Sequence, residues 1–243
     1  MTYYSTPMLL DTFRLTDSDY SKTVENITDH FKKSPGGFNY SRAAKYQRVA
    51  FSGFKNLDSL HKQCLGDGNS RALIENAKVF RLISGLSIGR AIQTFNFPKR
   101  SLTLARGIDA PMGPSFFFVE NETIKLFYIH CRNGHRASQQ DLAMLASAYK
   151  NEILELEFFG LKADIELIDV GPRNKDGLAT VDSYSLGDLI LPSIEEMKAK
   201  TDMFLKAFKY VDENRMAGEK IKPKKKEEQQ DDQWSLGLDN TNL

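Results

Sequence analysis

Hydrophobic residues in the first third of the chain recur at helical spacing. From about residue 17 to residue 33, four apolar residues follow one another at steps of four, three and four: Tyr20, Val24, Ile27 and Phe31. This spacing places them on one face of a helix. Looser apolar faces predict a second helix over about 40–65, which we expect Gly53 to interrupt, and a third over about 70–86. The N-terminal part of the chain is therefore predicted to be helical.

The pattern changes to strands after residue 100. Residues 101–105 alternate between polar and apolar positions, as in a strand with one buried face. The runs 115–119 and 123–132 are rich in aromatic and β-branched residues, and a turn at Glu120-Asn-Glu122 separates them. We expect these two runs to form a hairpin.

A helix, a strand and a last helix are predicted to follow the hairpin. Ser138, with Asp141 three residues later, is expected to cap a helix that ends near Gly160. The run 163–170 is predicted to be a strand, and the last helix is expected to begin at Ser193.

These elements predict an α+β protein with N-terminal helices, an α-β-β-β-α-β core and a C-terminal helix, in which the helices pack against one side of the sheet. We divide the chain into an N-terminal helical region (1–69), an α+β core domain (70–215) and a charged tail (216–243). The tail is expected to be disordered because it buries little apolar area. Three carboxylates of the strand at 163–170 are then expected on its solvent face or at its end: Asp164, Glu166 and Asp169.

Composition narrows the class of protein. The net charge of +1 offers no global electrostatic argument for nucleic-acid binding. The two cysteines, Cys64 and Cys131, lie far apart, which disfavours a disulfide framework or a zinc site built on paired thiolates. The sequence shows neither a signal-peptide pattern nor a run of eighteen apolar residues. We therefore expect a soluble, cytoplasmic protein with no membrane partner.

The order α-β-β-β-α-β resembles the core of restriction-endonuclease-like nucleases, over roughly residues 70–170. In that family an acid opens the second strand and a Glu-x-Lys lies on the third, so that carboxylates hold magnesium and the lysine orients the attacking water. Asp109 lies near the place of the first acid, but the third strand, Thr123 to Arg132, contains no Glu-x-Lys. The resemblance therefore implies a catalytically empty version of the fold or a rearranged site.

A metal-dependent nuclease with a rearranged site is the main alternative that includes catalysis. It would use Asp109, Glu120 and His130 with magnesium or manganese as cofactor, and it requires these side chains to converge in a cleft. Our leading interpretation assigns no catalytic residue, metal or other cofactor. The sequence leaves open whether the protein is an enzyme.

Basic side chains gather where the predicted hairpin ends. Four of them fall within seven residues: His130, Arg132, His135 and Arg136. Arginine forks and the free N–H groups at the start of the Ser138 helix are suited to phosphate. Together with Arg100, which lies in a run of basic and aromatic residues, Arg132, His135 and Arg136 are candidates for nucleic-acid or phosphate binding. A plainer interpretation is that the arginines end a strand and solvate a loop, while His130 is a hydrogen-bonded core residue.

The charged tail ends in an apolar cluster with the only tryptophan of the chain. Its segment Gln233-Trp-Ser-Leu-Gly-Leu238 resembles the six-residue form of the bacterial sliding-clamp-binding motif, which reads Gln, two variable residues, Leu, one variable residue and Leu. The resemblance implies that Gln233 hydrogen-bonds at the edge of a pocket on the clamp, while Leu236 and Leu238 fill its hydrophobic floor. Trp234 occupies a variable position and adds an exposed aromatic anchor.

These observations together predict a non-catalytic accessory protein of DNA replication, repair or mobile-element biology. We expect its tail to bind a protein partner, a sliding clamp in this interpretation, and its body to contact nucleic acid or another protein. The alternatives are the metal-dependent nuclease and a structural or assembly protein whose tail binds a sister subunit.

Overall fold

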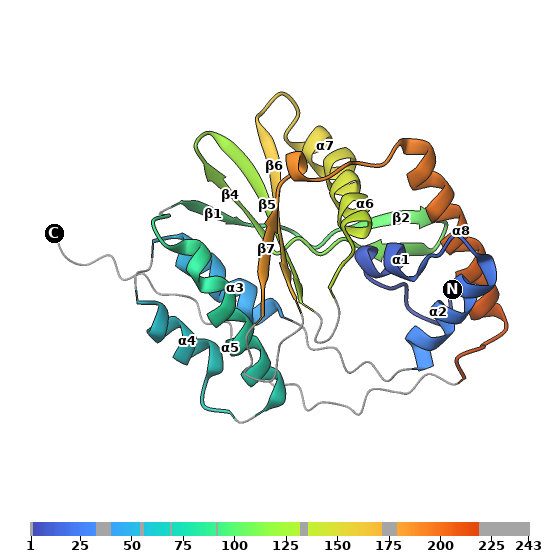
Figure 1. Ribbon diagram of the computed structural model, residues 1–243, viewed down its shortest axis with the longest axis horizontal. Helices are drawn as coiled ribbons and strands as arrows, with labels where there is room; N and C mark the ends of the chain where they lie inside the picture. Colours follow the sequence, from blue (N-terminus) through green and yellow to red (C-terminus); the bar gives the residue numbers. More distant parts are fainter. Residues whose placement is uncertain are drawn as a thin grey trace.

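A five-stranded mixed sheet lies at the centre of the protein (Figure 1). The computed structural model describes residues 2–32, 40–53, 56–68, 70–90, 92–131, 136–171 and 179–218. In spatial order the strands are β1 (Gln93–Asn96), β4 (Phe116–Glu120), β5 (Thr123–Cys131), β6 (Ala163–Val170) and β7 (Val181–Tyr184). Among the described strands of this sheet, β5 and β6 run parallel, and the other neighbouring pairs are antiparallel.

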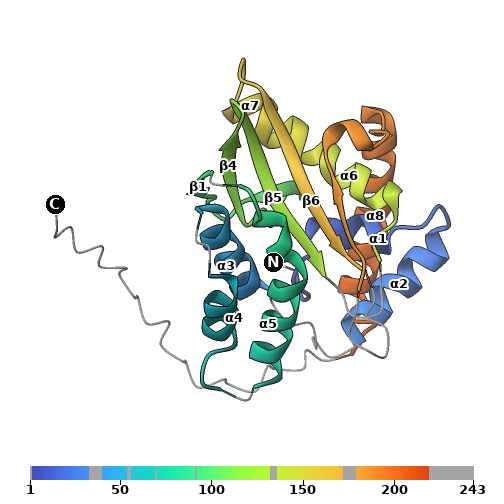
Figure 2. The same cartoon turned by 60° about the vertical axis from the view of Figure 1, so that its left-hand side comes forward.

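One face of the sheet is covered by three helices: α3 (Ser41–Phe51), α4 (Leu57–Leu65) and α5 (Arg71–Ile83). Figure 2 shows them stacked beside the strands. An aromatic cluster joins the two layers, because Phe51 of α3 makes edge contacts with Phe116, Phe118 and Phe127 at centroid distances of 5.9, 5.3 and 5.4 Å. Gly53 follows α3 with φ of 90°, a conformation that favours glycine, and so separates α3 from α4.

The opposite face is covered by α6 (Gln139–Tyr149), which connects the parallel strands β5 and β6. A π-helical segment, Lys150–Leu154, and the short α7 (Glu155–Glu157) continue it. The side chain of Tyr149 is fully buried, and its hydroxyl donates a hydrogen bond to the carbonyl oxygen of Met112 at 2.6 Å. Helix α1 (Leu9–Leu15) packs against α6 on this side.

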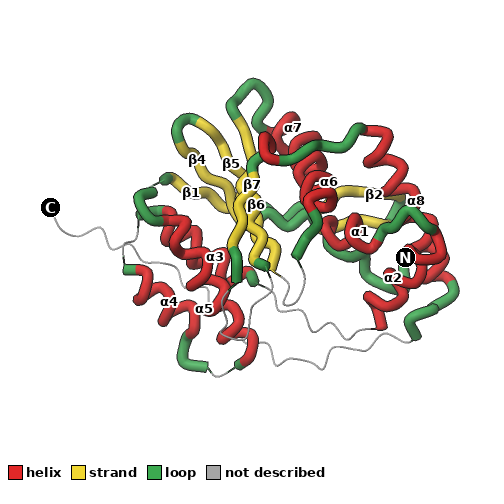
Figure 3. Tube along the Cα trace, in the orientation of Figure 1, coloured by secondary structure: helices red, strands yellow, loops and turns green. Residues whose placement is uncertain are grey.

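A second group of elements lies beyond α6, as Figure 3 shows. It consists of the two-stranded hairpin β2 (Ser101–Ala105) and β3 (Ile108–Pro111), helix α2 (Tyr20–Lys32) and the long helix α8 (Ile194–Glu213). A separate apolar cluster holds this group together, with Ile27, Phe204 and Phe208 at its centre. Within the described ranges, no helix has the length and apolar character needed to cross a bilayer.

The predicted α+β class is confirmed, with N-terminal helices, a mixed sheet and a C-terminal helix. The strand predicted at 101–105 forms as β2, but its place in the core is wrong, because β2 pairs with β3 in a separate sheet and β1, which the sequence did not predict, pairs with β4 instead. The expectation that helices pack against one side of the sheet is wrong, since they cover both faces. The solvent exposure predicted for the carboxylates of β6 is wrong for Glu166 and Asp169, for the same reason. Glu166 is 8% exposed and Asp169 is not exposed at all. The parallel strand that carries them lies inside the sheet, and such strands are usually buried on both faces.

Candidate functional site

A row of ionisable side chains crosses three strands on the face covered by α6. In the sheet register His130 of β5 lies opposite Asp169 of β6, and Asp169 lies opposite Asp182 of β7. Residues directly opposite on neighbouring strands point to the same side, so the three form one lateral row. The row lies at the carboxyl ends of the parallel strands, the place where α/β sheets most often bind ligands. We call His130, Asp169, Asp182 and Arg136 the charged row.

The inner part of the charged row is a buried histidine–aspartate pair. Nδ1 of His130 and Oδ1 of Asp169 are 2.6 Å apart, and the side chains are 5% and 0% exposed. If the carboxylate is ionised, Nδ1 must carry the proton that forms this bond. Within the described part of the chain, His130 Nε2 has no hydrogen-bond partner. The pair therefore fastens β5 to β6, and it confirms the interpretation of His130 as a hydrogen-bonded core residue.

Arg136 covers the outer part of the charged row. Its guanidinium lies 2.7 Å from Oδ2 of Asp182 and 3.5 Å from Oδ2 of Asp169. It also donates a hydrogen bond to the hydroxyl of Thr180. The room here is small, because a Cβ added at Gly171 would lie 3.0 Å from the same guanidinium. The sequence suggested Arg136 as a phosphate ligand, but two carboxylates already bind its guanidinium. A phosphate would have to displace these carboxylates from the arginine.

The start of α6, beside the charged row, is also satisfied by the chain itself. The hydroxyl of Ser138 accepts from the backbone N–H of Asp141 at 3.0 Å and donates to its carboxylate at 2.6 Å. Lys200 of α8 binds the other carboxylate oxygen of Asp141 at 3.1 Å.

The charged row also affects Tyr184 on β7. Burial raises the pKa of Tyr184, the charges of Asp182 and Asp169 raise it further, and the charge of Arg136 lowers it. These contacts suit a structural role for the charged row better than anion capture.

The three candidate residues of the nuclease alternative do not come together. Asp109 lies on β3, outside the main sheet, and accepts a hydrogen bond from Thr103 at 2.6 Å. Glu120 ends β4 opposite Thr123 and binds Arg90 on the face covered by α3 to α5. His130 lies seven residues further along β5, about 23 Å away at the rise of a strand, and faces the opposite side. The convergence that this alternative requires is absent from the fold.

A second cluster of charges, which sequence reasoning missed, surrounds Arg90. Its guanidinium makes paired hydrogen bonds with Glu120, at 2.7 and 2.9 Å, and with Glu166, at 2.9 Å each. Lys125 binds Glu120 as well, at 3.0 Å. The guanidinium also lies over the rings of Phe51 and Phe118, 4.4 and 5.0 Å from their centroids. We call Arg90, Glu120, Lys125 and Glu166 the Arg90 cluster.

The Arg90 cluster controls the ionisation of its outer carboxylate. Burial by itself would raise the pKa of Glu120, but hydrogen bonds from Arg90 and Lys125 outweigh it and lower the pKa below 4.5. Arg90 and Glu166 are 76 residues apart, so no local spacing in the sequence indicates that they meet. Only the pairing of β5 with β6 brings Glu166 to the strand beside Lys125.

The remaining candidates are separate from both clusters. Arg100 lies on the surface, where it forms an ion pair with Glu157 at 2.7 Å and lies 6.0 Å from the ring of Phe97. The other predicted site residues fall outside the described residues: Arg132, His135, Gln233, Trp234, Leu236 and Leu238. In the described ranges, no three His, Cys, Asp or Glu side chains are grouped so that they could hold a metal ion.

The chain matches no protein-family model, no curated protein and no solved structure.

Proposed function

We propose that the protein is a non-catalytic, DNA-associated accessory protein with a restriction-endonuclease-like core. The observation that carries this proposal is the topology. With the β2–β3 hairpin set aside as an insertion, the elements run α5-β1-β4-β5-α6-β6. Three antiparallel strands are followed by a crossover helix and a parallel strand, in consecutive spatial order. This order resembles the α-β-β-β-α-β order of the nuclease core, with helices on both faces of the sheet. In it β1 takes the place of residues 101–105, the strand that the sequence predicted as the first of the core.

The side chains of the core strands support a non-catalytic role. By position, β4 is the second core strand and β5 the third. The second core strand opens with Phe116, which lies opposite Phe127, where the nuclease family has an acid. The third carries no carboxylate, and its Tyr128 and His130 are 8% and 5% exposed. An active nuclease needs carboxylates that share a metal ion near these positions. Because a fold alone does not determine activity, we assign the DNA-associated role without hydrolysis.

The C-terminal peptide supplies the recruitment step of the proposal. Gln233, Leu236 and Leu238 match the fixed positions of the sliding-clamp-binding motif. A short peptide of this kind binds with modest affinity and exchanges quickly, which suits a protein that visits a moving replication assembly. The proposed partner is therefore a sliding clamp, and the body of the protein would act on DNA close to it.

The test measures binding of the full-length protein to a purified bacterial sliding clamp by surface plasmon resonance. Replacing Gln233 and Leu236 together by Ala is expected to weaken binding at least thirtyfold, because a buried anchor typically contributes about 2 kcal/mol. The matched control replaces Asn240 and Asn242 by Ala, in the same tail but outside the motif, and is expected to bind like the wild type.

Two results would overturn the proposal. Equal binding by the motif variant and the control would remove the clamp as partner. Cleavage of duplex DNA by the wild-type protein with magnesium or manganese, lost in the variant His130→Ala, would show that the protein is a nuclease.

A further inference from the structure

Positive charge is concentrated in the helical layer that covers one face of the sheet. Residues 40–90, which contain α3, α4 and α5, hold nine Lys and Arg against three Asp and Glu. This segment therefore has a net charge of +6, or +5 without Arg90, which binds Glu120 and Glu166 outside the segment, whereas the other 192 residues have a net charge of −5. Although the net charge of the whole chain is only +1, the charge is distributed unevenly along it. Local electrostatic fields of this kind guide association with charged partners.

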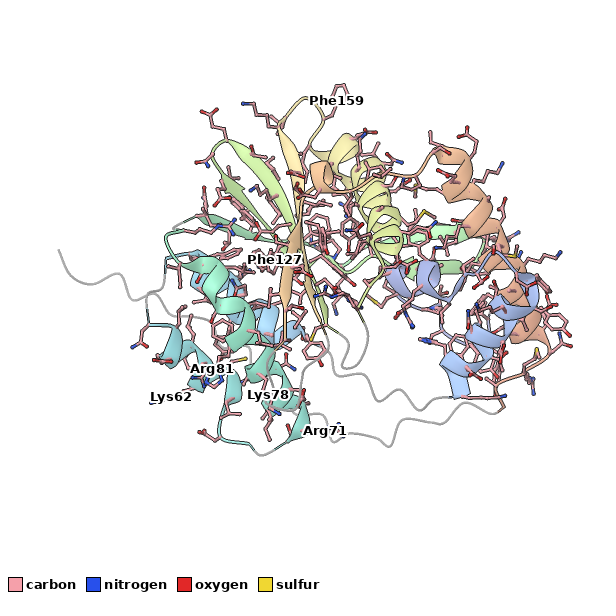
Figure 4. The ribbon with its side chains drawn as sticks, viewed as in Figure 1. Lys62, Arg71, Lys78, Arg81, Phe127 and Phe159 are labelled. Atoms are coloured by element: carbon pink, nitrogen blue, oxygen red, sulfur yellow. The ribbon has the colours of Figure 1, made fainter. Side chains whose placement is uncertain are left out.

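Four exposed cations of this layer lie on α4 and α5, as Figure 4 labels them: Lys62, Arg71, Lys78 and Arg81. Three of these residues follow one another on α5 at steps of seven and three, which places them within one side of the helix. Ten residues of helix span about 15 Å. The apolar residues Ala77, Phe80 and Ile83 of the same helix are buried toward the sheet, so the cations occupy the outer side. We call these four residues the basic face.

Glu75 of α5 offsets the charge of the basic face only in part. Glu75 binds Lys78 at 3.1 Å, but its own side chain is only 11% exposed, while that of Lys78 is 55% exposed. The field of the face also reaches α4. Burial lowers the pKa of His61, and the positive charge of Arg81 lowers it further against the opposing effect of Asp58. The face therefore keeps a net positive charge toward solvent.

We propose that the basic face binds the phosphate backbone of duplex DNA. Phosphates follow one another about every 3.4 Å along the axis on each strand, so a row of cations about 15 Å long covers roughly four base pairs. In the described part of residues 40–90, the only strongly exposed large apolar side chain is Ile88, and no exposed aromatic ring is available to stack on an unpaired base. The contacts are therefore to phosphates, without sequence preference. This inference does not rest on the clamp-binding peptide.

The experiment measures binding of the full-length protein to a fluorescent 25-base-pair duplex by anisotropy, between 50 and 200 mM salt. For the wild type, log K is expected to fall with log salt with a slope of about −3, as for three or four phosphate contacts. The double variant K62A/R81A is expected to bind the duplex about tenfold more weakly than the wild type. Its plot of log K against log salt should have a slope closer to −1.

The matched control is K198A/K209A, which removes two exposed lysines from α8 and changes the net charge equally. It is expected to bind like the wild type. Both variants keep the tail, so its lysines contribute equally to each. Circular dichroism and thermal unfolding are the controls that both variants fold.

Three outcomes would overturn this inference: an equal loss in the two double variants, no binding of duplex by the wild type, or tighter binding of a single strand of the same sequence. If the basic face binds an acidic protein instead of DNA, the wild type should not bind the duplex. If it binds single-stranded DNA, the single strand should bind more tightly than the duplex. Clamp binding is read out separately, so a failed clamp assay with intact duplex binding would reject the proposed recruitment alone.

Discussion

At the residue scale, Arg90 is the side chain that compensates the two carboxylates of the Arg90 cluster, Glu120 and Glu166. It is one cation between two carboxylates, and its charge is only partly exposed, with the side chain at 19%. Desolvation alone would lower the pKa of Arg90, but Glu166 and Glu120 raise it, so the guanidinium stays charged. Removing one partner from such a cluster leaves the other charges buried without compensation.

We therefore expect Arg90→Met to lower the free energy of unfolding by about 3–5 kcal/mol. Chemical denaturation monitored by circular dichroism measures the change. Arg106→Met is the matched control, because Arg106 is exposed between β2 and β3, and we expect an effect within about 0.5 kcal/mol.

A second variant tests the cause of this loss. Adding Glu166→Gln to Arg90→Met removes the carboxylate that is left in a buried position, and it should restore part of the lost stability. The effect of Glu166→Gln on the free energy of unfolding is measured both in the wild type and in Arg90→Met. If Glu166→Gln destabilises both backgrounds equally, the two residues are not coupled and the ion-pair explanation is wrong.

At the element scale, the hairpin of β4 and β5 shows how closely local sequence specified structure. Glu120 pairs with Thr123, so the loop has two residues, Asn121 and Glu122, with φ of 48° and 61°. Such a loop is a tight hairpin turn in which both central residues adopt positive φ, and it favours Asn followed by Gly. Asn121 meets this preference, whereas Glu122 is strained.

We expect Glu122→Gly to raise the free energy of unfolding by about 0.5–1 kcal/mol, since glycine adopts positive φ without steric cost. Thermal unfolding of the variant checks this result. Glu122→Ala keeps the Cβ and removes the carboxylate, so it should bring no gain. A gain of the same size in the alanine variant would assign the effect to charge instead of backbone strain.

The long elements were predictable, whereas the shortest strands were not. Helices α2, α5 and α8 have apolar faces or caps that are visible in the sequence, such as the capping box of Ser193 with Glu196. Strands β1 and β7 have four residues each and no clear alternation in burial. They form because β4 and β6 offer unpaired edges, which is information that lies elsewhere in the chain.

At the scale of the whole molecule, the packing of complete layers sets how stability depends on pH. Cys64 of α4 is fully enclosed in the layer of α3 to α5, and burial raises the pKa of its thiol from 9.0 to about 11. Burial likewise raises the pKa of Tyr149 in α6 well above 10.0. Both groups hold their protons more tightly when the protein is folded than when it is unfolded.

We therefore expect the buried thiol of Cys64 to contribute fully to the free energy of unfolding below pH 9. This contribution should be lost as the pH rises from 9 to 11, because the thiol ionises at lower pH in the unfolded chain than in the folded protein. The loss should amount to about 2–3 kcal/mol. Denaturation curves at pH 8, 9.5 and 11 measure it. Cys64→Ala should be less stable at pH 8 but should lose less over this interval, and parallel pH profiles for the two proteins would contradict the assignment.

The sequence by itself determined the α+β class, most helices, the central hairpin and the caps of α5, α6 and α8, because these depend on residues a few positions apart. The surplus of positive charge in residues 40–90 can also be counted directly. Tertiary structure alone decided that the sheet is covered on both faces, that His130 pairs with Asp169 and that Arg90 joins Glu120 to Glu166. These contacts join residues between 30 and 76 positions apart, and the two that involve β6, His130 with Asp169 and Arg90 with Glu166, exist because β6 pairs beside β5. No local pattern can specify which distant strand becomes a neighbour, whereas burial of both faces and compensation of each charge decide it once the layers pack.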